Sequence, residues 1–261
     1  MPKFAANLSF LFTEVPFLER FALARAAGFT AVEYHFPYDY SLPALKERLA
    51  ANGLTQVLFN MPPGDWAGGE RGLGALPGRS DEFRAGVAKA VEYACALGVP
   101  RVNCLAGIRV EGRSEAEHWQ TLAANVRYAA EVFRANGLSL VVEAINRFDM
   151  PGFFLNKSSQ VLELLEEVAM PNVFIQHDIY HAQREEGELV STLRRHIARI
   201  GHIQIADNPG RHQPGTGEIN YPFILAELDA LGYQGYVGLE YIPSPDTGSS
   251  LGWIKQFGYK L

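Results

Sequence analysis

The chain has 261 residues, of which 48% are hydrophobic and 20% are charged, and its formal net charge is −6. This is the composition of a globular protein that can bury a sizeable core, and we expect one domain over residues 1–261. The acidic balance offers no overall basic face for phosphate contacts, so we expect no nucleic-acid partner.

The two cysteines, Cys95 and Cys104, do not form a disulfide framework, and we expect both to be small core residues. No apolar run reaches the roughly 18 residues that a membrane helix needs. The N-terminal stretch lacks the apolar region and cleavage site of a signal peptide. We therefore expect a cytoplasmic protein without a membrane partner.

One pattern recurs along the chain: a helical stretch ends in glycine and a short apolar run follows, as in "RAAGFTAVEYH" and "FRANGLSLVVEAI". Glycine fits the left-handed position after a helix, and a short apolar run is typical of a buried parallel strand. Seven such junctions, two of them variants, together with a first strand give eight βα units, which predict a single (β/α)₈ TIM barrel, with a doubly wound open sheet as the competing fold. The expected strands lie near residues 4–9, 31–35, 56–60, 101–105, 139–145, 173–178, 202–206 and 236–241.

One connection, residues 60–79, is rich in glycine and has no helical period. A structureless loop of about 20 residues in a compact domain is usually functional or disordered. Because it follows the third expected strand at the catalytic end of a barrel, we predict a lid or substrate-binding loop.

Polar side chains gather at the ends of the last four expected strands, where TIM barrels carry their active sites. The strands deliver Glu143, Asp178, Gln204 and Glu240 in turn. Close carboxylates repel one another, and a divalent cation removes that conflict. An all-oxygen set suits Mg²⁺ or Mn²⁺ better than zinc, so we predict a metal site with these four ligands.

Other polar residues near the same end are candidate substrate contacts. His181 lies just past Asp178, and His202 shares a strand face with Gln204 because strand side chains alternate. Glu33 and His35 share a face of the second expected strand. Arg211 is the first candidate to bind an anionic substrate. Arg71, Arg79 and Arg109 are weaker candidates.

Several segments together resemble the hydroxypyruvate isomerase family, within the larger xylose-isomerase-like group of barrels: "NMPPGDWAGGERG", "VVEAINRFDMPGFFL", "QHDIYHAQ", "GHIQIADNPGRHQPGTGEINY" and "GLEYIPS". The resemblance covers nearly the whole chain. It implies one divalent metal held by Glu143, Asp178, Gln204 and Glu240, with the two glutamates as acid and base. It also implies His181 and Arg211 beside the substrate. Related ketose epimerases commonly carry His at the third ligand position, so Gln204 points away from them.

The resemblance implies an aldose–ketose type isomerase of a small anionic keto acid, converting hydroxypyruvate to tartronate semialdehyde by proton transfer through an enediolate. A 2-oxo-tetronate isomerase and a sugar 3-epimerase remain as alternatives on the same scaffold, and a metal-assisted hydride shift as the rival mechanism. A zinc endonuclease of this fold needs a histidine-rich cluster and a basic groove. The seven histidines and net charge of −6 of this chain disfavour that alternative. A non-catalytic metal-binding barrel is the alternative of a different class. The group often associates, so a homo-oligomer is compatible with the sequence.

Overall fold

The computed structural model describes residues 1–261 and contains eight parallel strands that close into a barrel in chain order, β1 to β8. The barrel closes where β1 pairs with β8, with Lys3 opposite Tyr236 and Ala6 opposite Leu239. This closure confirms the predicted TIM barrel and excludes the open sheet. The strands are β1 (Lys3–Asn7), β2 (Ala31–Glu33), β3 (Thr55–Asn60), β4 (Arg101–Cys104), β5 (Ser139–Glu143), β6 (Val173–Asp178), β7 (Ile200–Ile205) and β8 (Tyr236–Leu239).

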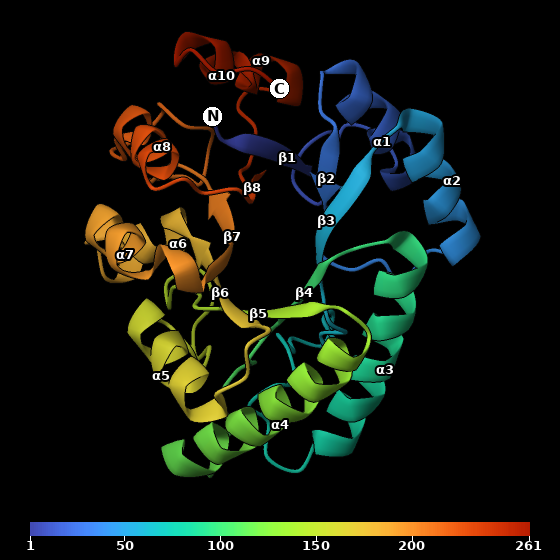
Figure 1. The fold of residues 1–261 in the computed structure, drawn as a ribbon, viewed down its shortest axis with the longest axis vertical. Helices are drawn as coiled ribbons and strands as arrows, with labels where there is room; N and C mark the ends of the chain where they lie inside the picture. Colours follow the sequence, from blue (N-terminus) through green and yellow to red (C-terminus); the bar gives the residue numbers. More distant parts are fainter.

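Helices surround the strands, and both termini lie beside β1 and the last helices (Figure 1). The C-terminal helices pack on the start of the first strand, where the Phe4 and Trp253 rings meet edge to face at 5.4 Å. The helices are α1 (Phe17–Ala26), α2 (Leu42–Asn52), α3 (Ser80–Leu97), α4 (Glu115–Ala135), α5 (Ser158–Val168), α6 (Ile179–Glu185), α7 (Leu189–His196), α8 (Tyr221–Ala230), α9 (Thr247–Ser250) and α10 (Gly252–Gln256), with a 3₁₀ turn at Ile197–Arg199.

Local sequence signals set several helix boundaries. Ser114 caps α4 in a capping box with Glu117, which satisfies backbone N–H groups that the first turn leaves free. Gly53 and Gly98 end α2 and α3 in the left-handed region, with φ of 58° and 69°. These are helix-to-strand junctions at which the repeated pattern predicted glycine, because a Cβ is disfavoured in that conformation.

The expected strands match the observed ones with small shifts. The range 173–178 agrees with β6, whereas β7 begins two residues before the expected 202 and β2 ends two residues before the expected 35. A register irregularity at Val32 and Glu33 accompanies the early end of β2. The expectation for the cysteines was half wrong: Cys104 is buried on β4, but Cys95 lies on the exposed face of α3.

The barrel interior is layered. Strand side chains alternate between the helices and the lumen, so residues two apart on a strand stack along the barrel axis. An apolar layer fills the middle of the lumen, formed by Ala5, Ala31, Val57, Leu58 and Val141. Polar residues lie above it at the carboxyl ends of the strands. None of the helices combines the length and apolarity required to cross a lipid bilayer.

Candidate active site

Three of the four predicted metal ligands come together at the carboxyl end of the barrel. Glu143 ends β5, Asp178 ends β6, and Glu240 follows β8. Together with His181, from the first turn of α6, they offer oxygen and nitrogen atoms within 4.8 Å of one another, and all four residues are buried. We call Glu143, Asp178 and Glu240 the carboxylate cluster. A buried group of this kind could hold a metal ion.

Asp178 has two different oxygens. Oδ1 caps helix α6 by accepting from the backbone N–H groups of Tyr180 at 2.7 Å and His181 at 3.3 Å. Oδ2 is buried, has no hydrogen-bond partner, and faces His181 Nε2 at 3.7 Å. The helix start therefore fixes the carboxylate while one oxygen stays free inside the cluster. The helix cap therefore allows a buried strand to end in an acid.

The tautomer of His181 follows from its neighbour Asn146. The Asn146 carbonyl oxygen accepts from the N–H groups of Phe148 and Asp149, so its amide nitrogen faces His181 Nδ1 at 2.6 Å and donates to it. The neutral ring then carries its proton on Nε2, which points at the carboxylate cluster. Burial and the charge of Arg211 lower the pKa of His181 to about 3, so the ring stays neutral. His181 is arranged as a hydrogen-bond donor rather than as a ligand.

Glu240 accepts four hydrogen bonds. Arg211 Nη2 donates at 2.6 Å and His35 Nε2 at 2.7 Å, with Asn7 at 3.2 Å and Gln204 at 3.3 Å. Burial alone would raise the pKa of this carboxyl, but Arg211 and His35 lower it to about 2. Arg211 has a φ of 56°, in the left-handed region that non-glycine residues rarely adopt. Its guanidinium packs on the rings of Phe10 and Tyr180.

The other two carboxyls resist ionisation. Burial, and then the charges of Glu240 and Asp178, hold the pKa of Glu143 well above its usual range. Burial and Glu240 likewise raise the pKa of Asp178 to about 7. Three buried carboxyls share one guanidinium, so the cluster has too little positive charge to balance three carboxylates. This is the electrostatic deficit that a divalent cation would offset.

A cavity of about 160 Å³ opens over the cluster, and we call it the upper cavity. The loop of residues 60–79 reaches its rim through Trp66, and the Arg71 guanidinium stacks on the indole 4.3 Å from the ring centre. The lining residues are Phe10, His35, Asn60, Trp66, Leu105, Glu143, Ile145, Asp149, Met150, His181, Arg211 and Glu240.

Glu33 and His202 lie beneath the upper cavity and are not part of its wall. The Glu33 carboxylate accepts from His202 Nε2 at 2.6 Å, Gln204 Nε2 at 2.7 Å and Asn7 Nδ2 at 3.0 Å. Gly238 leaves room for it, since a Cβ there would overlap the Glu33 carboxylate. Asn7 and Gln204 also donate to Glu240, so Glu33 holds two groups that orient a member of the cluster.

Gln204 lies beside the cluster with its amide nitrogen toward Glu240, while its carbonyl oxygen accepts from Gln176 Nε2 at 2.6 Å. Asp178 and Gln204 are paired across β6 and β7, as their shared level in the barrel predicted. In this orientation the carbonyl oxygen of Gln204 faces away from the cluster.

Three arginines named as weaker candidates lie outside the cavity wall. Arg71 stacks on Trp66, Arg79 pairs with Glu70 at 2.6 Å, and Arg109 pairs with Glu115 at 3.2 Å. Arg211 is the arginine that the fold brings to the cluster.

Sequence reasoning missed three asparagines at or near strand ends. Asn7 donates to Glu33 and Glu240, and Asn103 donates to Glu143 at 3.1 Å and to Asn60 at 3.2 Å. These amides lie at or near the ends of β1, β3 and β4 just as Glu143 and Asp178 lie at the ends of β5 and β6, so polar amides at strand ends are the sequence signal for them.

Comparison with known proteins places this chain in a family. The family described as Xylose isomerase-like TIM barrel matches residues 21–257. A 2-oxo-tetronate isomerase of Cupriavidus necator is 48% identical over 98% of this chain and 99% of its own. The hydroxypyruvate isomerase of Escherichia coli is also 48% identical, over 98% of this chain and all of its own. A solved structure titled AP endonuclease, family 2, from Brucella melitensis is 45% identical, with a TM-score of 0.96 over 98% of this chain and 99% of that chain.

The chain therefore belongs to the xylose isomerase-like TIM barrel family. Within it, the chain groups with the hydroxypyruvate and 2-oxo-tetronate isomerases, as the sequence motifs predicted, and it is an enzyme of the isomerase class. More distant structures, such as a D-allulose 3-epimerase from Methylomonas at 20% identity and a TM-score of 0.80, share the fold.

Proposed function

We propose that this protein is a divalent-metal-dependent isomerase of a small 2-oxo acid, interconverting hydroxypyruvate and tartronate semialdehyde. The observation that carries the proposal is the buried carboxylate cluster at the floor of the upper cavity, beside a single guanidinium. The names of the relatives at 48% identity support the substrate class. Since those names include both hydroxypyruvate isomerase and 2-oxo-tetronate isomerase, 2-oxo-tetronate is the alternative substrate.

The residues present fit a divalent cation. The buried, unpartnered Asp178 Oδ2 is an orphaned acceptor, and the excess of carboxyls over guanidinium supplies the negative charge. Glu143, Asp178 and Glu240 would hold the ion, and half a turn of the Gln204 amide would present its oxygen as the fourth ligand. Oxygen donors suit Mg²⁺ or Mn²⁺. When bound, such an ion stabilises negative charge that develops on substrate oxygen.

The chemistry needs a proton to leave one carbon and another to arrive at its neighbour. In hydroxypyruvate, C3 loses a proton to a carboxylate and its electrons form the C2–C3 double bond of an enediolate. A carboxylic acid then protonates C2, the C3 hydroxyl loses its proton as it becomes the aldehyde, and the C2 oxygen gains a proton as it becomes the hydroxyl, so the atoms balance. Glu143 and Glu240 enter the upper cavity from β5 and β8 and would serve as this pair, with either one starting according to direction.

Three further groups would orient the substrate. Arg211 and the neutral Nε2–H of His181 face the upper cavity and would bind the carboxylate and an oxygen of a small acid. His35 lines the same wall from just beyond the end of β2. Trp66 and Phe10 would exclude water from the reacting carbons. The small cavity favours a three- or four-carbon acid over a hexose, which argues against the sugar 3-epimerase alternative.

A coupled assay with a substrate panel tests the proposal. Hydroxypyruvate, 2-oxo-tetronate and D-allulose are offered to the protein in Mg²⁺ or Mn²⁺, and again with excess chelator. We expect turnover of one of the two acids, lost with chelator and restored by metal. Turnover unaffected by chelation, or preference for D-allulose, would refute the proposal.

Isotope exchange separates the proton route from the hydride rival. Substrate deuterated at C3 should lose label to solvent during turnover if a glutamate carries the proton. Complete retention of deuterium at C2 of the product would favour the hydride shift. Metal binding without turnover of any compound on the panel would favour the non-catalytic metal-binding barrel. Cleavage of a DNA duplex that contains an abasic site would favour the endonuclease alternative.

A further inference from the structure

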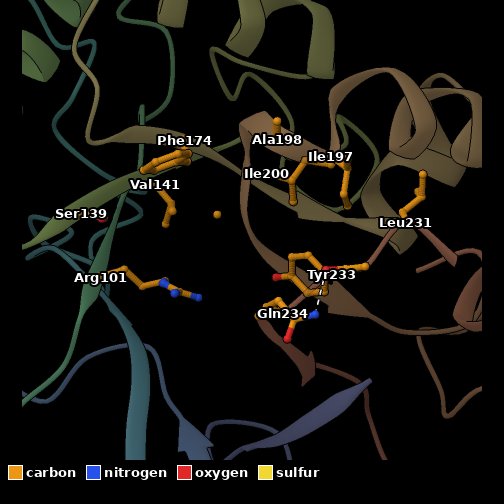
Figure 2. Close-up of a pocket in the computed structure, with 13 residues that line it drawn as sticks. Arg101, Ser139, Val141, Phe174, Ile197, Ala198, Ile200, Leu231, Tyr233 and Gln234 are labelled. Carbon is orange, nitrogen blue, oxygen red and sulfur yellow. Dashed lines mark hydrogen bonds between the residues drawn. The ribbon is translucent and has the colours of Figure 1, made fainter. Parts of the chain in front are cut away.

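A second and larger cavity, of about 430 Å³, lies at the opposite end of the barrel, and we call it the lower cavity (Figure 2). It is lined by Arg101, Ser139 and Ile200, the first residues of β4, β5 and β7, whereas the upper cavity lies at the last residues of the strands. The loop of residues 231–235 before β8 closes one side. The isomerisation described above uses none of its residues.

Arg101 is the charged group of the lower cavity. Asn103, two residues on, points into the lumen to bind Glu143, so Arg101 points into the same lumen lower down. Its guanidinium makes no ion pair or hydrogen bond with any protein group, and Nη1 is buried without a partner. Figure 2 shows the guanidinium projecting across the cavity toward Tyr233 and Gln234.

The rest of the wall is mostly apolar. Val141, Phe174, Ile197, Ile200 and Leu231 line it, and Phe174 is half-buried there although it lies inside a barrel. The side-chain donors opposite Arg101 are already engaged with backbone carbonyls. Tyr233 donates to the carbonyl of Tyr236, and the Gln234 amide nitrogen donates to the carbonyl of Gly232. The cavity thus combines one free cation with an apolar wall.

Gly201 helps to keep this space open. A Cβ at this position would lie 2.8 Å from Phe174 Cβ and 3.0 Å from Val141 Cγ1, two residues of the wall. A larger residue would therefore displace the wall.

We propose that the lower cavity is a second binding site, for a small organic monocarboxylate with an apolar body. The guanidinium presents a planar fork of N–H donors that matches a carboxylate, and no carboxyl group of the protein lies close enough to pair with it. The Ser139 hydroxyl lies on the same wall. The volume is in the range of small-molecule sites, and an apolar ring or branched chain would cover Val141 and Phe174. Water alone would satisfy the guanidinium but would leave the apolar wall wetted.

Calorimetric titration with benzoate tests the site, with neutral benzamide as the matched probe. Because Arg211 in the upper cavity could also bind a carboxylate, the titration is repeated on Arg101→Met and Arg211→Met. We expect benzoate to bind the wild type and Arg211→Met with similar affinity. We expect at least a tenfold loss in Arg101→Met and weak or no binding of benzamide.

Binding that survives Arg101→Met, or that disappears in Arg211→Met, would overturn the proposal, as would a cavity that holds only water at saturating benzoate. Ala198→Trp serves as a second variant because the exposed Ala198 lies on the cavity wall, away from the guanidinium. It should block benzoate while Arg101 stays intact. A crystal of the full chain grown with 4-bromobenzoate should place the bromine beside Phe174.

Discussion

The two ends of the barrel lumen carry opposite charge imbalances. At the upper end three buried carboxyls share Arg211, whereas at the lower end Arg101 has no carboxyl at all. The lower cavity is the larger, about 430 Å³ against 160 Å³, yet the reactive groups surround the smaller one. Charge imbalance, rather than volume, therefore distinguishes what each end is suited to bind: a cation above and an anion below.

Removing a carboxylate from the upper end should have the largest effect. Glu240→Gln and Glu143→Gln each remove a proton carrier from the cluster, and we expect kcat to fall by about 10³-fold or more, at the upper end of what one acid–base group contributes. Steady-state kinetics measure this. Glu131→Gln, on the exposed face of α4, is the matched control and should leave kcat unchanged. Near wild-type turnover in either cluster variant would break the assignment.

Metal binding should stabilise the protein more as pH rises. The ion must replace protons on Glu143, whose pKa is held high, and on Asp178, with a pKa of about 7, while His181 is already neutral above about 3. Asp178 is mostly deprotonated above pH 7, so the stabilisation by excess Mn²⁺ should grow between pH 5.5 and pH 8. At 100 times Kd it would reach about 2.7 kcal/mol.

Thermal unfolding with and without Mn²⁺ at each pH gives this difference directly. Subtracting the metal-free curve removes the separate effects of buried histidines such as His177, whose lowered pKa of about 4 makes its own contribution to stability rise with pH. A stabilisation independent of pH would mean that the ion binds away from the two protonated carboxyls.

Filling the space beneath the upper cavity should have an intermediate effect. Gly238→Ala would push the Glu33 carboxylate away from Asn7 and Gln204, the groups that also donate to Glu240. Loss of such supporting contacts typically costs about 10–100-fold in activity or metal affinity. We expect that loss in kcat/KM and in Mn²⁺ affinity. Gly252→Ala, which meets nothing within 4 Å, is the control and should change neither.

Changing the lower end should have the smallest effect on turnover. Arg101→Met removes an unpaired charge that contacts no residue of the upper cavity, so we expect kcat/KM to stay within about twofold and stability to change by less than about 1 kcal/mol. A large loss of activity would show that the two ends are coupled, and the contrast between them would need revision.

The sequence predicted the barrel because seven helix-to-strand junctions, most of them marked by glycine, follow a first apolar strand. It found Glu143, Asp178 and Glu240 because strand ends share one level in such a fold. The exposure of Cys95 depends on which face of α3 packs against the barrel, and Cys95 lies on the opposite, exposed face. The approach of Glu33 to Gln204, the stacking of Arg71 on Trp66 and the absence of a partner for Arg101 depend on three-dimensional packing that no local pattern encodes.

The most direct test of the central claim is anomalous diffraction from a crystal of the full chain grown in Mn²⁺. We expect one strong peak bounded by Glu143, Asp178 and Glu240, with the Gln204 amide turned so that its oxygen faces the ion. Full density for the protein with no manganese at those three carboxylates, or with the ion bound elsewhere, would contradict the account.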